Sequence, residues 1–159
     1  MVKALVLQRS NVAASWSCIL ENAQGNATRI YRSTAAAILA AQIPDVYLER
    51  AIVRPNHWSK QEREYLLVTN ERLKEYHIYI GSHDYGTNLA IYWYLVVTPP
   101  DLFTVLSAGD SHLFQQQEVH AYVTVIHRCL RQAIAELLLS MGQETSQLEA
   151  TTTGFLGVE

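Results

Sequence analysis

The stretch YHIYIGSHDYGTNLAIYWYLVV, residues 76–97, decides the fold class of this chain. Two runs rich in β-branched and aromatic residues flank the segment SHDYGTN, an arrangement typical of a β-hairpin. Apolar or aromatic side chains occupy both alternating registers of each run, whereas a sheet with one face in water alternates polar and apolar residues. The sequence therefore predicts a hairpin at the centre of an antiparallel sheet, with both of its faces covered.

A long helix over residues 111–141 is the natural cover for that sheet. Its apolar residues recur in steps of three and four, as on one face of a helix; they are Val119, Val123, Ile126, Leu130, Ile134, Leu137 and Met141. Further apolar residues lie around the other side, namely Tyr122, Val125, Cys129 and Leu139. One sheet does not cover so much apolar surface, so we expect this helix to meet a second copy of the chain or a protein partner.

Shorter elements complete the predicted domain. The Asn and Gly residues of NAQGN predict a β-hairpin over 15–32, and the alanine-rich run at 33–43 predicts a short helix. A strand is predicted at 45–54, a short helical turn at 59–64 and another strand up to residue 69. The fold class expected is α+β: an antiparallel sheet of about four to six strands covered by one long C-terminal helix and short helices.

We expect one domain over residues 1–141, with residues 1–13 peripheral to it. Residues 142–159 are predicted to form a polar linker and a short apolar tail, GFLGV, which contains Phe155 and Leu156. This tail is a candidate docking segment, and a frayed terminus is the alternative interpretation.

Composition excludes several classes of function. About half of the residues are hydrophobic (49%) and the net charge is only −3, without the clustered Lys and Arg typical of nucleic-acid binders, so no nucleic-acid partner is expected. No apolar run approaches the length of about 20 residues that crosses a bilayer. The cysteines, Cys18 and Cys129, match no zinc or redox spacing, and no signal peptide is evident, so we expect a cytoplasmic location. Phosphate-loop and dinucleotide motifs are missing, and neither a cofactor nor a metal is expected.

Histidines supply the candidate catalytic residues. His83 and Asp84 stand side by side in the hairpin loop, where a base or ligand could be presented on a rigid scaffold. Asp and Gly are also what a tight turn requires, and we favour this structural interpretation. His120 and His127 lie on one side of the long helix, but seven residues of helix rise about 10.5 Å, too far for both to bind one zinc ion.

The leading hypothesis is a non-catalytic interaction or assembly module that self-associates through the long helix. The residues expected to contact a partner are Val119, Val123, Val125, Leu139, Phe155 and Leu156. The alternative is a small enzyme or a protein that binds a metal or small molecule, with a site between loop 82–88 and the long helix. His83, Asp84 and either His120 or His127 would form that site.

Overall fold

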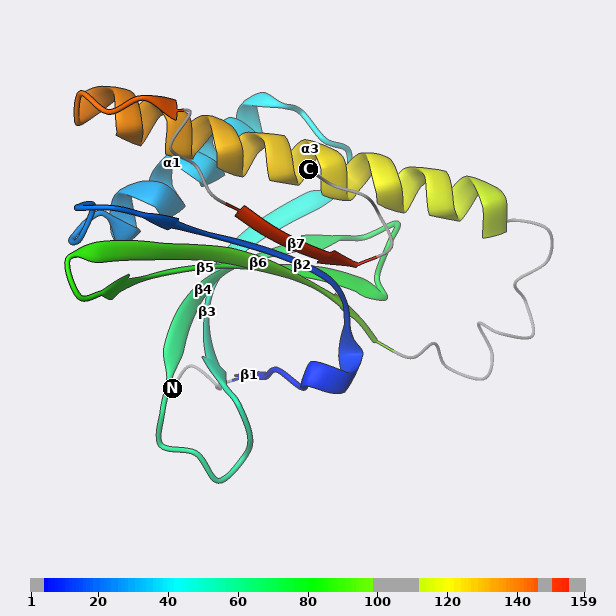
Figure 1. Cartoon of the computed structure of the whole chain (residues 1–159). Coiled ribbons are helices and arrows are strands. Elements are labelled where there is room, and N and C mark those ends of the chain that lie inside the picture. The colour runs from blue at the N-terminus through cyan, green and yellow to red at the C-terminus, as the bar shows by residue number, and fades with distance from the viewer. Residues whose placement is uncertain (1–4, 99–111, 146–149, 155–159) are drawn as a thin grey trace.

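A single sheet runs through the whole molecule, with both helices on one side of it (Figure 1). The computed structural model describes residues 5–98, 112–145 and 150–154. In chain order its elements are β1 (Leu5–Val6), the 3-10 helix η1 (Arg9–Asn11), β2 (Val12–Leu20), α1 (Ala27–Ala40), β3 (Val46–Arg54), β4 (Arg63–Asn70), β5 (Tyr76–Tyr85), β6 (Asn88–Val97), α3 (His112–Ser140) and β7 (Ala150–Gly154).

The sheet is mostly antiparallel and has the strand order β1-β3-β4-β5-β6-β2-β7. Strands β3 to β6 form a meander of consecutive hairpins, and β2 and β7 extend it antiparallel beyond β6. The two-residue β1 pairs parallel with β3 at the opposite edge. The α+β class, with a mostly antiparallel sheet, one long helix and a second helix, is confirmed; the two short strands near the ends of the chain bring the sheet to seven strands.

The sheet is curled, and the connection from β1 to β2 requires it. Strands β1 and β2 are five places apart, which would put them about 24 Å from each other in a flat sheet. The chain from Val6 to Val12 spans at most about 22 Å when extended, and η1 shortens it further. Curling brings the two ends of the sheet together, and the inner side of the curl holds its own apolar cluster.

Helices α1 and α3 cover the other face of the sheet (Figure 1). The largest buried side chains of this main core come from the strands and from both α-helices, and include Trp16, Ile30, Ile38, Ile78, Ile80, Leu89, Ile91, Trp93, Leu95, Ile126, Leu130 and Ile134. Both faces of the β5–β6 hairpin are therefore covered, as its sequence predicts. Strand β5 ends at Tyr85 and β6 begins at Asn88, so the turn consists of Gly86 and Thr87. Gly86 has a left-handed backbone conformation with a φ of 63°.

The predicted hairpin over residues 15–32 is wrong. Only its first half is a strand, β2, and the second half belongs to α1, which begins at Ala27 rather than near Ser33. The side chain of Asp84 accepts a hydrogen bond from the backbone N–H of Gly25 at 2.9 Å and holds the chain where it leaves the sheet. Helix α1 then buries Ile30, Thr34 and Ile38, which recur at intervals of four residues.

Three further sequence predictions are corrected. Residues 59–62 form no helical turn; the Ser59 hydroxyl accepts the Gln61 N–H at 3.1 Å in a local turn instead. The segment 1–13 is not wholly peripheral, because β1 joins the sheet edge and β2 begins at Val12. The predicted linker contains β7, which pairs with β2. Phe155 and Leu156 lie outside the described residues.

Candidate functional site

The structure places His83 and Asp84 on opposite faces of the sheet. His83 lies on the face away from the helices, where its Nδ1 is 3.0 Å from the hydroxyl of Tyr92. Burial, with a contribution from the nearby Arg63 cation, lowers the pKa of His83. Asp84 is on the helix side and holds Gly25. The two side chains therefore do not form a dyad, and Asp84 has the structural role that we favoured.

The two helical histidines are also separated in role. His127 is buried, and its Nδ1 accepts a hydrogen bond from the indole N–H of Trp93 at 3.0 Å. Its ring packs edge-on against Trp16, with the ring centroids 5.0 Å apart. His120 is exposed. Since His83 lies across the sheet from α3, the structure does not bring the predicted catalytic residues together.

The residues predicted to contact a partner divide into three groups. Val119 and Val123 are buried by their own chain, as are Tyr122 and Cys129, so none of the four lies on the outer surface where a protein partner would dock. Helix α1 packs against α3 in the same core and supplies part of the cover for its apolar surface. Val125 is half-buried, whereas Leu139 is 69% exposed. Phe155 and Leu156, the partner contacts predicted in the tail, lie outside the described residues.

Metal and membrane sites are not found in the described part of the chain. No group of three or more His, Cys, Asp or Glu residues within it is placed to hold a metal ion. Neither of its helices combines the length and the apolar run that crossing a bilayer requires.

Tyrosines gather on the sheet face that points away from the helices. Tyr65, Tyr79 and Tyr92 are buried in the cluster inside the curl, and their rings pack edge-on. A side chain at Gly81 would overlap the Tyr92 ring, so this glycine makes room for the cluster. Burial raises the pKa of Tyr65, and the neighbouring Tyr92 adds to the rise. These phenols fill a core, which is the interpretation of aromatic strands that packing favours.

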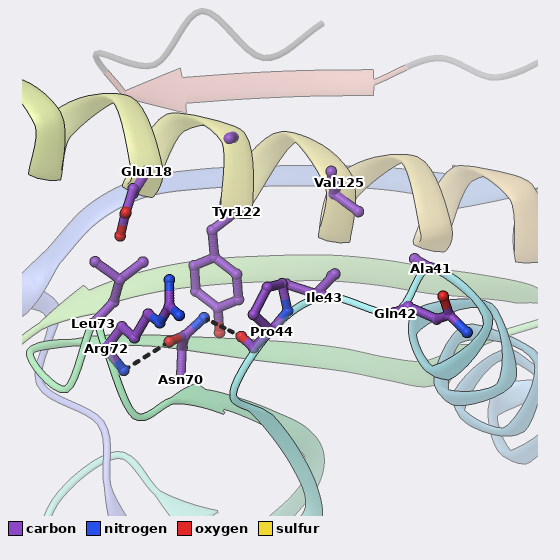
Figure 2. A pocket seen from close by; sticks show the side chains of 11 residues that line it. Ala41, Gln42, Ile43, Pro44, Asn70, Arg72, Leu73, Glu118, Tyr122 and Val125 are labelled. Carbon is purple, nitrogen blue, oxygen red and sulfur yellow. Dashed lines mark hydrogen bonds between the residues drawn. The ribbon is translucent and has the colours of Figure 1, made fainter.

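A pocket lies at the other face, where the end of α1, the β4–β5 turn and the middle of α3 meet (Figure 2). Its volume is about 360 Å³, within the range of small-molecule sites. Eleven residues from these three segments line it: Ala41, Gln42, Ile43, Pro44, Asn70, Arg72, Leu73, Glu118, Ala121, Tyr122 and Val125. Six of these residues are aliphatic or proline, and the other five carry polar or charged groups, namely Gln42, Asn70, Arg72, Glu118 and Tyr122.

The α1–β3 connection is fixed in place by Asn70. The amide of Asn70 donates to the carbonyl oxygen of Pro44 at 3.2 Å, and its Oδ1 accepts the N–H of Arg72 at 2.9 Å (Figure 2). Gln42 and Asp45, on either side of this contact, adopt left-handed backbone conformations, with φ of 51° and 58°. One buried amide thus holds two of the three segments that form the pocket.

Tyr122 projects from α3 toward Asn70 and Pro44 and forms the inner wall of the pocket (Figure 2). Its side chain is buried, and its hydroxyl has no hydrogen-bond partner among the described residues. Burial raises the pKa of this phenol, so it is a neutral donor at pH 7. A buried hydroxyl without a partner costs about 1 to 3 kcal/mol. This is the feature of the pocket that packing alone does not explain.

Charged groups stand at the mouth of the pocket. The Nε of Arg72 lies 2.7 Å from the Asp45 carboxylate, so this cation is already paired. Glu118 lines the mouth from α3 and makes no ion pair with any residue of the described segments. The arrangement can therefore bind a small, largely apolar molecule and offers it one phenol inside and one carboxylate at the rim.

Sequence reasoning missed this pocket because its walls come from three distant segments. Tyr122 was noted only as surplus apolar surface of the helix, and Glu118 and Arg72 were not singled out. The one available signal was a tyrosine within the apolar stripe of a buried helix, since a buried phenol normally needs a hydrogen-bond partner. Comparison of the chain with protein-family models, curated proteins and solved structures found no match.

Proposed function

We propose that this protein binds a small, largely apolar molecule in the pocket between α1, α3 and the β4–β5 turn, without catalysing a reaction on it. The observation that carries the proposal is the buried, unpartnered hydroxyl of Tyr122 in the wall of an apolar pocket of about 360 Å³. A ligand with one hydrogen-bonding group would satisfy this hydroxyl after a small adjustment of the wall, and its apolar part would be buried.

The geometry around the pocket favours binding over catalysis. A general base must lie within hydrogen-bond reach of the proton it takes, and a nucleophile needs such a base beside it. Glu118 is a carboxylate that could take a proton, but no Ser, Thr, Cys or His is among the described residues that line the pocket, so no such nucleophile is paired with this base. The buried thiols are unsuited to attack as well, because burial raises the pKa of Cys18 to about 12.

A ligand-observed NMR screen against a library of small amphiphilic molecules tests the proposal, with two variants that add the same ring. Ala121→Phe places an aromatic ring in the pocket wall, whereas Gln132→Phe places it on the exposed surface of the same helix, about 16 Å further along. We expect hits that bind the unaltered protein and Gln132→Phe equally but Ala121→Phe poorly. Hits that bind all three proteins equally, or an empty screen, would rule out this pocket as the site.

A second function, self-association, is favoured by the exposed side chains of α3. Leu113 and Phe114 are 62% and 69% exposed at the N-terminal end of this helix, which extends past the strands in Figure 1. Adjacent exposed apolar side chains mark contact surfaces more often than isolated ones do. Replacing both with glutamate should convert an oligomer to a monomer in native mass spectrometry. A monomeric unaltered protein at micromolar concentration would contradict this second function.

A further inference from the structure

We infer that the ligand of this pocket is a small organic amine, bound with its ammonium group at Glu118 and its apolar body against Ile43, Leu73 and Val125. The inference rests on the proposed function, since it names the class of molecule that the same pocket accepts. Three features carry it: the charge balance of the mouth, the apolar lining and the inner phenol.

The charge balance at the mouth favours a cation. One carboxylate, that of Glu118, and one guanidinium, that of Arg72, line the pocket, and Asp45, next in the chain to the lining residue Pro44, already holds this guanidinium at 2.7 Å. The neighbouring β4–β5 turn, residues 71–75, adds two further acids and one lysine. The Glu71 N–H donates to the carbonyl oxygen of Asp45 at 3.0 Å, which fixes this turn beside the pocket. An incoming ammonium group therefore meets an excess of negative charge.

A bare metal ion does not fit this mouth. Metal ions such as Ca²⁺ require six to eight oxygen ligands, whereas no described cluster of three or more acidic, His or Cys residues converges here. The lining beyond Glu118 is chiefly aliphatic, and an organic body would fill it. An ammonium group on an apolar organic molecule matches both the Glu118 carboxylate and the aliphatic lining.

The inner phenol selects further among amines. Tyr122 projects from α3 into the pocket, and its hydroxyl has no hydrogen-bond partner among the described residues. An arylalkyl amine with a hydroxyl group at the far end would supply one. We therefore expect tyramine to bind more tightly than phenethylamine, from which it differs by this hydroxyl alone.

Isothermal titration with four probes tests the inference: phenethylamine, tyramine, the neutral 2-phenylethanol and the anionic phenylacetate. We expect phenethylamine to bind roughly two- to fivefold more tightly than 2-phenylethanol, with phenylacetate weakest, as an exposed ion pair gives. Glu118→Gln should remove the preference for the amine. The matched control is Glu136→Gln, an exposed acid on the same helix about 27 Å away, and it should leave the preference unchanged.

The outcomes separate this inference from the proposed function. If 2-phenylethanol or phenylacetate binds as tightly as phenethylamine, and Ala121→Phe abolishes that binding, the pocket is a ligand site but not an amine site. If Glu136→Gln weakens amine binding as much as Glu118→Gln does, the amine is held by the general field of the protein and the inference is overturned. If none of the four probes binds at millimolar concentration, both the inference and the proposed function lose their support.

Discussion

Two hollows of nearly equal size lie between the helices and the rest of the protein, and each contains a buried tyrosine. One, of about 350 Å³, lies between α1 and strands β3 and β4 and contains Tyr31; the other, of about 360 Å³, contains Tyr122. Their volumes do not distinguish them. The hydroxyl of Tyr31 has several hydrogen-bond partners, whereas that of Tyr122 has none among the described residues.

The hydroxyl of Tyr31 links strands β4 and β5 by hydrogen bonds to the backbone of both. Pairing between β4 and β5 ends at Tyr65 opposite Gly81, and the next pair in this register would be Glu64 opposite Ser82. The phenol of Tyr31 occupies this place: it donates to the carbonyl oxygen of Glu64 at 2.8 Å and accepts the N–H of Ser82 at 2.8 Å. The guanidinium carbon of Arg50 lies 4.2 Å from the centroid of the Tyr31 ring, and its Nε donates to the Glu64 carboxylate. Arg32 and Glu49 also line this hollow and make no ion pair with a described residue.

We infer that a binding site differs from a packing defect in whether its buried polar groups have hydrogen-bond partners, and not in its volume. The phenol of Tyr31 is bonded to the backbone of Glu64 and Ser82, so a ligand would have to replace existing bonds to reach it, although the nearby Ser82 hydroxyl has no partner among the described residues. Around Tyr122 a hydroxyl and a carboxylate remain without partners in the described structure, so a ligand adds bonds. The following predictions test that distinction, beginning with the largest effect.

Replacing Tyr31 with phenylalanine should lower the free energy of unfolding by about 2 to 4 kcal/mol, because it leaves the buried N–H of Ser82 and the carbonyl of Glu64 without the phenol. Urea denaturation measures the loss. Tyr47→Phe, at an exposed tyrosine of β3, is the control and should change stability by less than about 0.5 kcal/mol. Equal stability of the Tyr31 variant and the unaltered protein would remove the contrast between the two hollows.

Alkaline pH should lower the stability that the buried Tyr31 contributes. Burial raises the pKa of Tyr31 from its ordinary value of 10 to about 12, so the unfolded chain loses this proton before the folded protein does. The stability that this tyrosine contributes is therefore complete below pH 10 and is lost as pH rises toward 12, by roughly 2 to 3 kcal/mol. Other buried tyrosines add to the decline, so the measurement is the difference in pH slope between the unaltered protein and Tyr31→Phe. Identical slopes would contradict the prediction.

His127 resembles Tyr31 because its side chain is a partner in a buried hydrogen bond, which it accepts from Trp93. Replacing His127 with phenylalanine keeps the ring but leaves the indole N–H of Trp93 without its acceptor. We expect a loss of about 1 to 3 kcal/mol in unfolding free energy and a shift in the tryptophan emission of the folded protein. A variant as stable as the unaltered protein would show that this histidine is not structural and would restore it as a functional candidate.

Periodic patterns made most of the fold predictable. The apolar steps of α3 and the alternation in β3 identified these elements, because local periodicity reports which face is buried. Runs of β-branched and aromatic residues on both registers identified β5 and β6. Helix α1 was missed over its first turns, since Thr28, Ile30 and Tyr31 are residues favoured in strands and NAQGN resembles a hairpin turn. The interval of four between Ile30, Thr34 and Ile38 was the competing signal, and tertiary packing on α3 decided in its favour.

The candidate site could not be predicted in the same way. Its walls come from residues 41–44, 70–73 and 118–125, which only the packed structure brings together. Whether a buried phenol such as Tyr31 or Tyr122 finds a partner also depends on backbone groups far away in the chain. For Tyr31 those groups are the carbonyl of Glu64 and the N–H of Ser82, which no local sequence pattern predicts.

Replacing Tyr122 with phenylalanine should destabilise the protein least and thereby complete the comparison. The hydroxyl makes no described hydrogen bond, so its removal costs none and relieves the burial of a polar atom. We expect the free energy of unfolding to stay unchanged or to rise by up to about 1 to 3 kcal/mol, which is the cost of the unpartnered hydroxyl. The same variant should lose the advantage of tyramine over phenethylamine in the binding experiment, while Tyr31→Phe retains it. A marked destabilisation would mean that the phenol already has a partner in the folded protein, and the pocket would then resemble the hollow at Tyr31 in kind as well as in size.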